Sequence, residues 1–165
     1  MSNLTYGELT EEGLKTLLEN IDTFDKNFYD LGSGKGEVVI NSINAFPDLK
    51  KSVGIEIVEE RHQEALRKKE KLNKYKKDKV YFLKGDITSS KFNLKDANLI
   101  YISNLCFDND LNDKLANKIS EEVSSGTLIF SSKNLPLKNV DCTYKRKVKQ
   151  SWIESSNIFV NRIKK

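Results

Sequence analysis

The chain has 165 residues, of which 38 % are hydrophobic and 32 % are charged, and its formal net charge is +4. This balance is typical of one globular domain. No apolar run approaches the roughly 18 residues of a membrane-spanning helix, and Met1-Ser2-Asn3 does not open a secretion leader, so we expect an intracellular protein without membrane contact. A single histidine, His62, and two cysteines exclude a multi-histidine metal centre and a structural zinc site, and we expect no metal.

Positive charge is concentrated in two segments. Residues 61–79 contain nine basic and three acidic residues, and residues 138–165 contain eight basic and two acidic residues, so each segment carries a net charge of +6. One interpretation is contact with a polyanion such as nucleic acid, or with an acidic protein surface. The other interpretation is a solvated, lysine-rich surface that binds nothing.

Apolar spacing predicts helices that alternate with strands. The predicted helices span residues 9–21, with Thr10 as N-cap, 36–46, 59–74 and 111–123. The predicted strands span residues 27–31, 53–57, 80–83, 99–102 and 127–130, followed by an antiparallel pair over 142–150 and 157–163. This alternation predicts an α/β fold with a mostly parallel sheet and helices on both faces. Such a sheet binds its ligand at the carboxyl ends of its strands.

A glycine-rich loop, Asp30-Leu31-Gly32-Ser33-Gly34-Lys35-Gly36, joins the first predicted strand to the helix that follows. Its G-x-G-x-G spacing differs from the G-x-G-x-x-G fingerprint of dinucleotide sites. The G-K-[ST] ending of a phosphate-binding P-loop is absent, because Gly36 follows Lys35. The acid at the start of the loop, Asp30, would repel a pyrophosphate and suits a ligand that carries positive charge.

Acidic residues lie at the tips of the first three predicted strands. Asp30 and Glu56 are the next-to-last residues of the first and second, and Asp86 follows the third. A carboxylate at the position of Glu56 can accept hydrogen bonds from both ribose hydroxyls, and Asp86 is placed to meet an adenine amino group. The alternative is that these acids are ordinary helix caps. All three beside one glycine loop favour an adenosine ligand with a cationic centre, which is S-adenosylmethionine.

The stretch Asp30–Val39 followed by Gly54-Ile55-Glu56 resembles class I methyltransferases. More narrowly, the chain is similar to the disruptor-of-telomeric-silencing histone-lysine methyltransferases, which lack a SET domain. That resemblance rests on Tyr6-Gly7-Glu8-Leu9 (family Y-G-E-T), Ile102–Phe107 (V-N-N-F-A-F), Gly126–Asn134 (G-G-R-I-V-S-S-K), and Ser151-Trp152 with the later aromatic Phe159. Ser103, Leu105 and Leu9 depart from the family pattern.

The resemblance implies a Rossmann-like class I methyltransferase fold, with a mostly parallel seven-stranded sheet, helices on both faces and an antiparallel C-terminal strand pair. It implies one domain over residues 1–165, in which residues 1–26 cover the cofactor and residues 27–165 form the catalytic sheet core. The cofactor would be S-adenosylmethionine, with S-adenosylhomocysteine as product and no metal. The implied cofactor-binding residues are Tyr6, Glu8, Asp30, Gly32, Gly34, Gly36, Glu37, Glu56, Asp86, Ile87 and Asn104.

The implied activity is in-line methyl transfer to a deprotonated lysine amine of a histone core lysine in nucleosomes. Asn104 would orient the amine or the cofactor, while Phe107, Trp152 and Phe159 would form an aromatic lysine channel. The implied protein is a monomer at chromatin in the nucleus, with nucleic-acid contact through segments 61–79 and 138–165. The alternatives are a lysine methyltransferase for a small basic or membrane-associated non-histone protein, which could be cytoplasmic, and a non-catalytic cofactor-binding module that contacts nucleic acid.

Overall fold

The computed structural model describes residues 9–150 and 153–165. Within them, seven strands form one sheet in the order β3-β2-β1-β4-β5-β7-β6. The strands are β1 (Asn27–Leu31), β2 (Lys51–Glu56), β3 (Val80–Lys84), β4 (Leu99–Ile102), β5 (Leu128–Ser131), β6 (Val140–Gln150) and β7 (Ile153–Ile163). Strands β1 to β5 run parallel, and β7 pairs antiparallel with both β5 and β6. The predicted fold class is confirmed.

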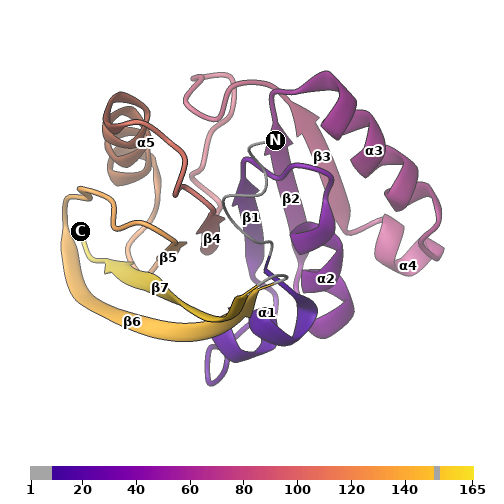
Figure 1. The fold of residues 1–165 in the computed structure, drawn as a ribbon, viewed down its shortest axis with the longest axis horizontal. Helices are drawn as coiled ribbons and strands as arrows, with labels where there is room; N and C mark the ends of the chain where they lie inside the picture. Colours follow the sequence, from indigo (N-terminus) through magenta and orange to yellow (C-terminus); the bar gives the residue numbers. More distant parts are fainter. Residues whose placement is uncertain (1–8, 151–152) are drawn as a thin grey trace.

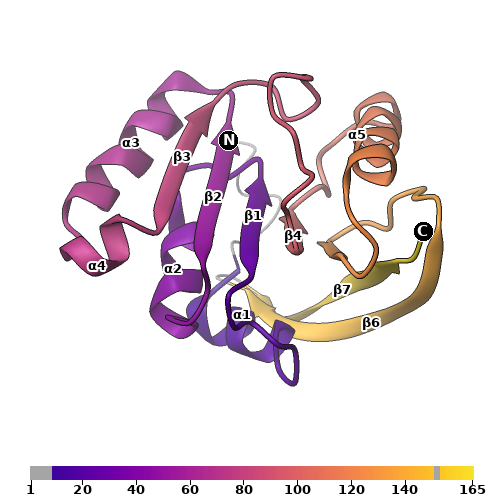
Figure 2. The same cartoon turned by 180° about the vertical axis from the view of Figure 1, so that it is seen from behind.

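Helices cover both faces of this sheet (Figures 1 and 2). They are α1 (Glu11–Leu17), α2 (Glu37–Ala45), α3 (Glu59–Glu70), α4 (Lys74–Lys77) and α5 (Asn109–Glu122). Helices α1, α2 and α3 lie over one face and enclose a core that includes Leu14, Val39 and Phe130. Helix α5 lies over the other face, above a second core that includes Leu115 and Ile100.

The predicted helix over 59–74 is wrong at its end, because two helices occupy that stretch. Helix α3 ends at Glu70, and the side chain of Asn73 accepts a hydrogen bond from the backbone N–H of Lys76 at 2.9 Å. An asparagine in this position starts a new helix by satisfying a free donor of the first turn. The predicted cap of α1 is confirmed, since the hydroxyl oxygen of Thr10 accepts from the backbone N–H of Gly13 at 2.9 Å.

Arg146 of β6 ties the N-terminal helix to the far edge of the sheet. Its guanidinium donates to the backbone carbonyls of Thr16, Leu17 and Glu19, which lie at the end of α1. A cation at a helix C-terminus is favourable, because the last carbonyls carry partial negative charge. Among the described helices, none is long and apolar enough to span a bilayer.

Candidate functional site

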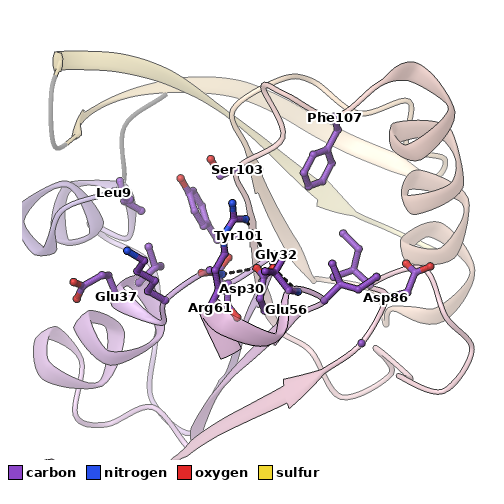
Figure 3. Close-up of a pocket in the computed structure, with 18 of the residues that line it drawn as sticks. Leu9, Asp30, Gly32, Glu37, Glu56, Arg61, Asp86, Tyr101, Ser103 and Phe107 are labelled. Atoms are coloured by element: carbon purple, nitrogen blue, oxygen red, sulfur yellow. Dashed lines mark hydrogen bonds and ion pairs between the residues drawn. The ribbon is translucent and has the colours of Figure 1, made fainter. Parts of the chain in front are cut away.

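A cavity of about 560 Å³ opens at the carboxyl ends of β1, β2, β3 and β4 (Figure 3). This volume is typical of a site for a small organic molecule. The charged residues that line it comprise four acids, Asp30, Glu37, Glu56 and Asp86, and two bases, Lys35 and Arg61. The surplus of acids favours a ligand with a cationic group.

The glycine loop forms one wall of the cavity. The backbone N–H groups of Gly32 and Ser33 donate to the carbonyl of Ile55 at 2.8 and 2.9 Å, which binds the loop to β2. Gly34 has a φ of +55°, and a Cβ built on it would meet nothing within 4 Å. The space beside Gly34 therefore belongs to the cavity and is open to a ligand.

Gly36 has a different role from Gly34. It caps α2 with a φ of +88°, and a Cβ on it would lie 2.6 Å from the ring of Phe82 and 2.9 Å from Ala65. Glycine is required here because both the backbone conformation and the packing against β3 and α3 exclude a side chain. Gly36 does not line the cavity, and its contact with a cofactor stays a prediction.

Glu56 points its carboxylate at the glycine loop although it is buried. One oxygen, Oε1, accepts from the backbone N–H of Gly34 at 2.7 Å, and Oε2 accepts from the N–H of Val58 at 3.0 Å. Arg61 adds an ion pair at 4.0 Å from Oε2. A carboxylate oxygen has two lone pairs, so each oxygen of Glu56 retains capacity for one further donor. Two further donors are what a ribose diol presents.

Asp86 lies on the loop that follows β3. Its Oδ1 accepts from both the backbone N–H of Thr88 at 2.9 Å and the Thr88 hydroxyl at 2.8 Å. These two hydrogen bonds, with the backbone one first, hold the pKa of Asp86 below its usual range. Because Oδ1 is used internally, Oδ2 remains for a ligand donor.

A buried lysine fastens this loop to α5. The ammonium of Lys118 donates to the backbone carbonyl of Ser89 at 2.9 Å and to that of Phe92, and it pairs with Glu122 at 3.0 Å. Glu122 in turn accepts from the backbone N–H of Leu94 at 2.9 Å. These contacts anchor residues 89–94, so the loop that carries Asp86 is held against α5.

The opposite side of the cavity is formed by β4 and the segment after it. Tyr101, Ser103 and Phe107 line the cavity there, whereas Asn104 does not. Asn104 is fully buried, and its side chain joins two loops. Its Nδ2 donates to the Lys133 carbonyl and to Oδ1 of Asn112, and its Oδ1 accepts from the Lys133 N–H and the Ser132 hydroxyl.

The structure brings most of the predicted site residues together. Those that line the cavity are Asp30, Gly32, Gly34, Glu37, Glu56, Asp86, Ile87 and Phe107. Phe159 does not line it and lies on β7 beneath the ammonium of Lys145, 5.3 Å from the ring centroid. Tyr6, Glu8 and Trp152 lie outside the described residues. The binding and catalytic roles of all these residues stay predictions.

Several residues of the cavity wall had no predicted role in binding, and those outside the glycine loop that are polar are Arg61, Tyr101 and Ser103. One signal was available for Arg61: it is a cation in the first turn of α3, where the helix dipole disfavours positive charge. For Ser103 the signal was its place directly after a strand that ends at the ligand-binding edge. Tyr101 reads as an ordinary buried strand residue, and its place in the wall depends on the tertiary structure.

The chain matches a known protein family. The family described as "Histone methylation protein DOT1" matches residues 1–160. The chain belongs to this family. A relative from Caenorhabditis elegans, "Histone-lysine N-methyltransferase, H3 lysine-79 specific", is 29 % identical over 154 residues, which are 86 % of this chain. The chain spans only 16 % of the length of that relative.

Several solved structures share the fold of this chain. TrmN from Thermus thermophilus superposes with a TM-score of 0.71 at 13 % identity, over 93 % of this chain and 48 % of that one. The protein yhhF from Escherichia coli gives 0.70 at 12 % identity, over 92 % and 83 %. The glycopeptide N-methyltransferase MtfA, solved with S-adenosyl-L-methionine, gives 0.64 at 11 % identity, over 96 % and 78 %. The fold is therefore that of the Rossmann-like class I methyltransferases.

Proposed function

We propose that the chain is an S-adenosylmethionine-dependent protein-lysine methyltransferase that acts on a histone core lysine in nucleosomes. The observation that carries this proposal is the convergence of the glycine loop with Asp30, Glu56 and Asp86 on one cavity of a DOT1-family chain. The C. elegans relative, whose name gives histone H3 lysine 79 as its target, supports the substrate class. This proposal implies that the protein is intracellular and is located at chromatin.

The residues present fit the cofactor. The two oxygens of Glu56 keep one acceptor position each for the ribose hydroxyls, and Asp86 keeps Oδ2 for the adenine amino group. Asp30, which is buried at the end of β1, and Glu37 add negative charge for the ammonium and sulfonium groups. Gly34 leaves its side of the cavity open, so the backbone can approach the ligand closely.

S-adenosylmethionine, when bound, supplies a methyl group on a positively charged sulfur. The chain must then orient a lysine amine and exclude water from it. A lysine amine is nucleophilic only when neutral, and its ordinary pKa is about 10.4. The apolar groups of Leu9, Phe107 and Leu111 line the cavity, and an apolar wall lowers a lysine pKa by disfavouring the charged form.

We propose that Asn104 supports the cavity wall from outside the cavity. Its four side-chain hydrogen bonds join the segment after β4 to that after β5, so it supports Phe107 and Ser103 without contacting the cavity. This differs from direct contact with the amine. The proposed aromatic channel would add Trp152 and Phe159 to Phe107.

The experiment is transfer of a labelled methyl group from S-adenosylmethionine to nucleosomes, free histones or a cell lysate, followed by mass-spectrometric mapping of the labelled residue. Gly34→Arg is the control, because its side chain would fill the open cavity. We expect label on a histone core lysine with the unchanged chain and none with the variant. Label only on a non-histone protein would replace the substrate, and label from Gly34→Arg would remove the assigned site.

The two basic segments differ in how much free charge they present, and we propose that only the C-terminal one contacts nucleic acid. In the described residues, five of the nine bases of segment 61–79 form ion pairs. These are Arg61, Arg67, Lys68, Lys74 and Lys77. On β6, the exposed Lys145 and Lys147 have no ion pair within the described residues and lie two positions apart, so their side chains share one face of the strand.

A further inference from the structure

Arg61 is one of the cavity residues that no pattern in the sequence assigned to ligand binding. It is the third residue of α3, and its side chain is half exposed, lines the cavity and lies 4.0 Å from Oε2 of Glu56 (Figure 3). A cation in the first turn faces the positive end of the helix dipole, which is an unfavourable position. Its orientation toward Glu56 offsets that cost.

The guanidinium of Arg61 lies close to the carboxylate of Glu56 but does not form a hydrogen bond with it. At 4.0 Å the guanidinium and the carboxylate form an ion pair, but they are too far apart for a hydrogen bond. A guanidinium has five N–H donors. Within the described residues, none of those of Arg61 takes part in a side-chain hydrogen bond, although the group lies in the cavity wall. Its donors are therefore available to a ligand that Glu56 also binds.

Arg67 on the same helix provides the contrast. It also pairs with an acid, but at 2.7 Å and through a hydrogen bond to Glu64, and it lies on the exposed surface. Arg67 thus forms a hydrogen bond with its acid, whereas Arg61 at the cavity does not. The difference indicates that Arg61 faces a space shaped for another molecule.

We infer that Arg61 is a cofactor-binding residue that contacts the nucleoside end of the ligand. This inference rests on the proposed function. The position beside Glu56 points to the ribose and the purine, which offer oxygen and nitrogen acceptors and a flat ring on which a guanidinium can stack. The other group in the ligand with which a guanidinium would pair is its amino-acid carboxylate, and the experiment separates these two contacts.

The experiment is isothermal titration of the full chain with S-adenosylhomocysteine and with 5′-deoxy-5′-methylthioadenosine, which keeps the nucleoside and lacks the amino acid. The variants are Arg61→Ala, Arg61→Gln and the matched control Arg67→Ala. We expect Arg67→Ala to bind both ligands like the unchanged chain. Arg61→Ala should weaken both by the same factor, about tenfold, and Arg61→Gln, which retains two N–H donors, should recover part of the loss.

The outcomes separate this inference from the proposed function. No binding of S-adenosylhomocysteine by the unchanged chain would remove the proposed function itself. Binding by the unchanged chain and equal binding by Arg61→Ala would overturn the role of Arg61 alone. A loss by Arg61→Ala that is confined to S-adenosylhomocysteine would also overturn it, because the contact would then be to the carboxylate. Thermal unfolding of each variant checks that a loss of affinity is not a loss of fold.

Discussion

The side-chain amide of Asn104 is hydrogen-bonded to both backbone groups of Lys133: Nδ2 donates to the carbonyl oxygen at 2.9 Å, and Oδ1 accepts from the N–H at 2.8 Å. This pair of bonds joins two loops that are 29 residues apart in the chain, at the ends of adjacent strands β4 and β5. The loop held in this way leads from Ser103 to Phe107, both of which line the cavity.

Asn104→Asp is expected to lower the free energy of unfolding by about 2–3 kcal/mol, because the new oxygen would face the Lys133 carbonyl and Oδ1 of Asn112, which both need a donor. Methyl transfer should fall as well, since Phe107 would lose its support. Urea denaturation measures the stability change. The exposed Asn109→Asp is the control and should change stability by less than about 0.5 kcal/mol. Equal unfolding of Asn104→Asp and the unchanged chain would contradict the support role.

Alanine should mainly lower stability at Gly36 and mainly weaken ligand binding at Gly34. Gly36→Ala forces a Cβ to within 2.6 Å of Phe82 at a φ of +88°, so we expect a loss of about 2–3 kcal/mol in stability. Gly34→Ala meets open space at a φ of +55°, so it should lose only about 1 kcal/mol of stability but bind S-adenosylhomocysteine more weakly. Thermal unfolding and calorimetry of both variants test this contrast. Equal destabilisation by the two variants would contradict it.

Lys118→Met should release the loop after β3. The substitution removes the ammonium that donates to the carbonyls of Ser89 and Phe92 and leaves Glu122 without its cation, so we expect a loss of about 2–4 kcal/mol. Lys114→Met on the same helix removes an exposed pair with Asp110 and should change stability by less than about 1 kcal/mol. Amide hydrogen exchange over residues 85–94 should rise in Lys118→Met only. Unchanged exchange there would show that the lysine does not anchor the loop.

The lowered pKa of Asp86 predicts how the free energy of unfolding changes as the pH falls. The folded state favours the ionised carboxylate through the Thr88 N–H and hydroxyl, so this contribution is present above the ordinary pKa of 3.8 and is lost as the pH falls through the lower folded value. The stability difference between the unchanged chain and Asp86→Asn should therefore shrink as the pH is lowered from 7 toward 3. Carboxyl NMR titration should give a midpoint below 3.8, and Thr88→Val should raise it. A midpoint at or above 3.8 would contradict the role of Thr88.

Lys145→Glu with Lys147→Glu should weaken nucleosome binding, more strongly at low salt, while leaving the affinity for S-adenosylhomocysteine unchanged. The reason is that exposed lysines contribute by releasing counterions from a polyanion, which is salt-dependent. Lys74→Glu with Lys77→Glu is the matched control, because these two lysines already pair with Asp78 and Glu70, and it should have the smaller effect. Electrophoretic mobility shifts across a salt series measure both. An equal effect of the two double variants would remove the distinction between the segments.

Local patterns alone predicted much of this molecule. Strands Asn27–Leu31 and Leu99–Ile102 match the predicted bounds, because runs of five and four residues between turn residues are long enough for a strand and too short for a typical helix. The gathering of Asp30, Glu56 and Asp86 at one cavity was also predictable. Parallel strands joined by right-handed crossovers bring their carboxyl ends to the same edge of a sheet, so residues at successive strand ends meet there.

Only the tertiary structure decided which distant residues are the hydrogen-bond and ion-pair partners of polar side chains. Asn104 was expected at the ligand, but its polar atoms are taken up by residues 8 to 29 positions further along the chain. Lys68 reads as free charge on a basic helix until Glu37, 31 positions earlier, is found beside it. Arg61 reads as one more base of that helix, and only the packing of α3 beside β2 turns it toward Glu56. The physical reason is that secondary structure follows the spacing of neighbouring residues, whereas the partner of a polar side chain depends on which distant segments the core brings together.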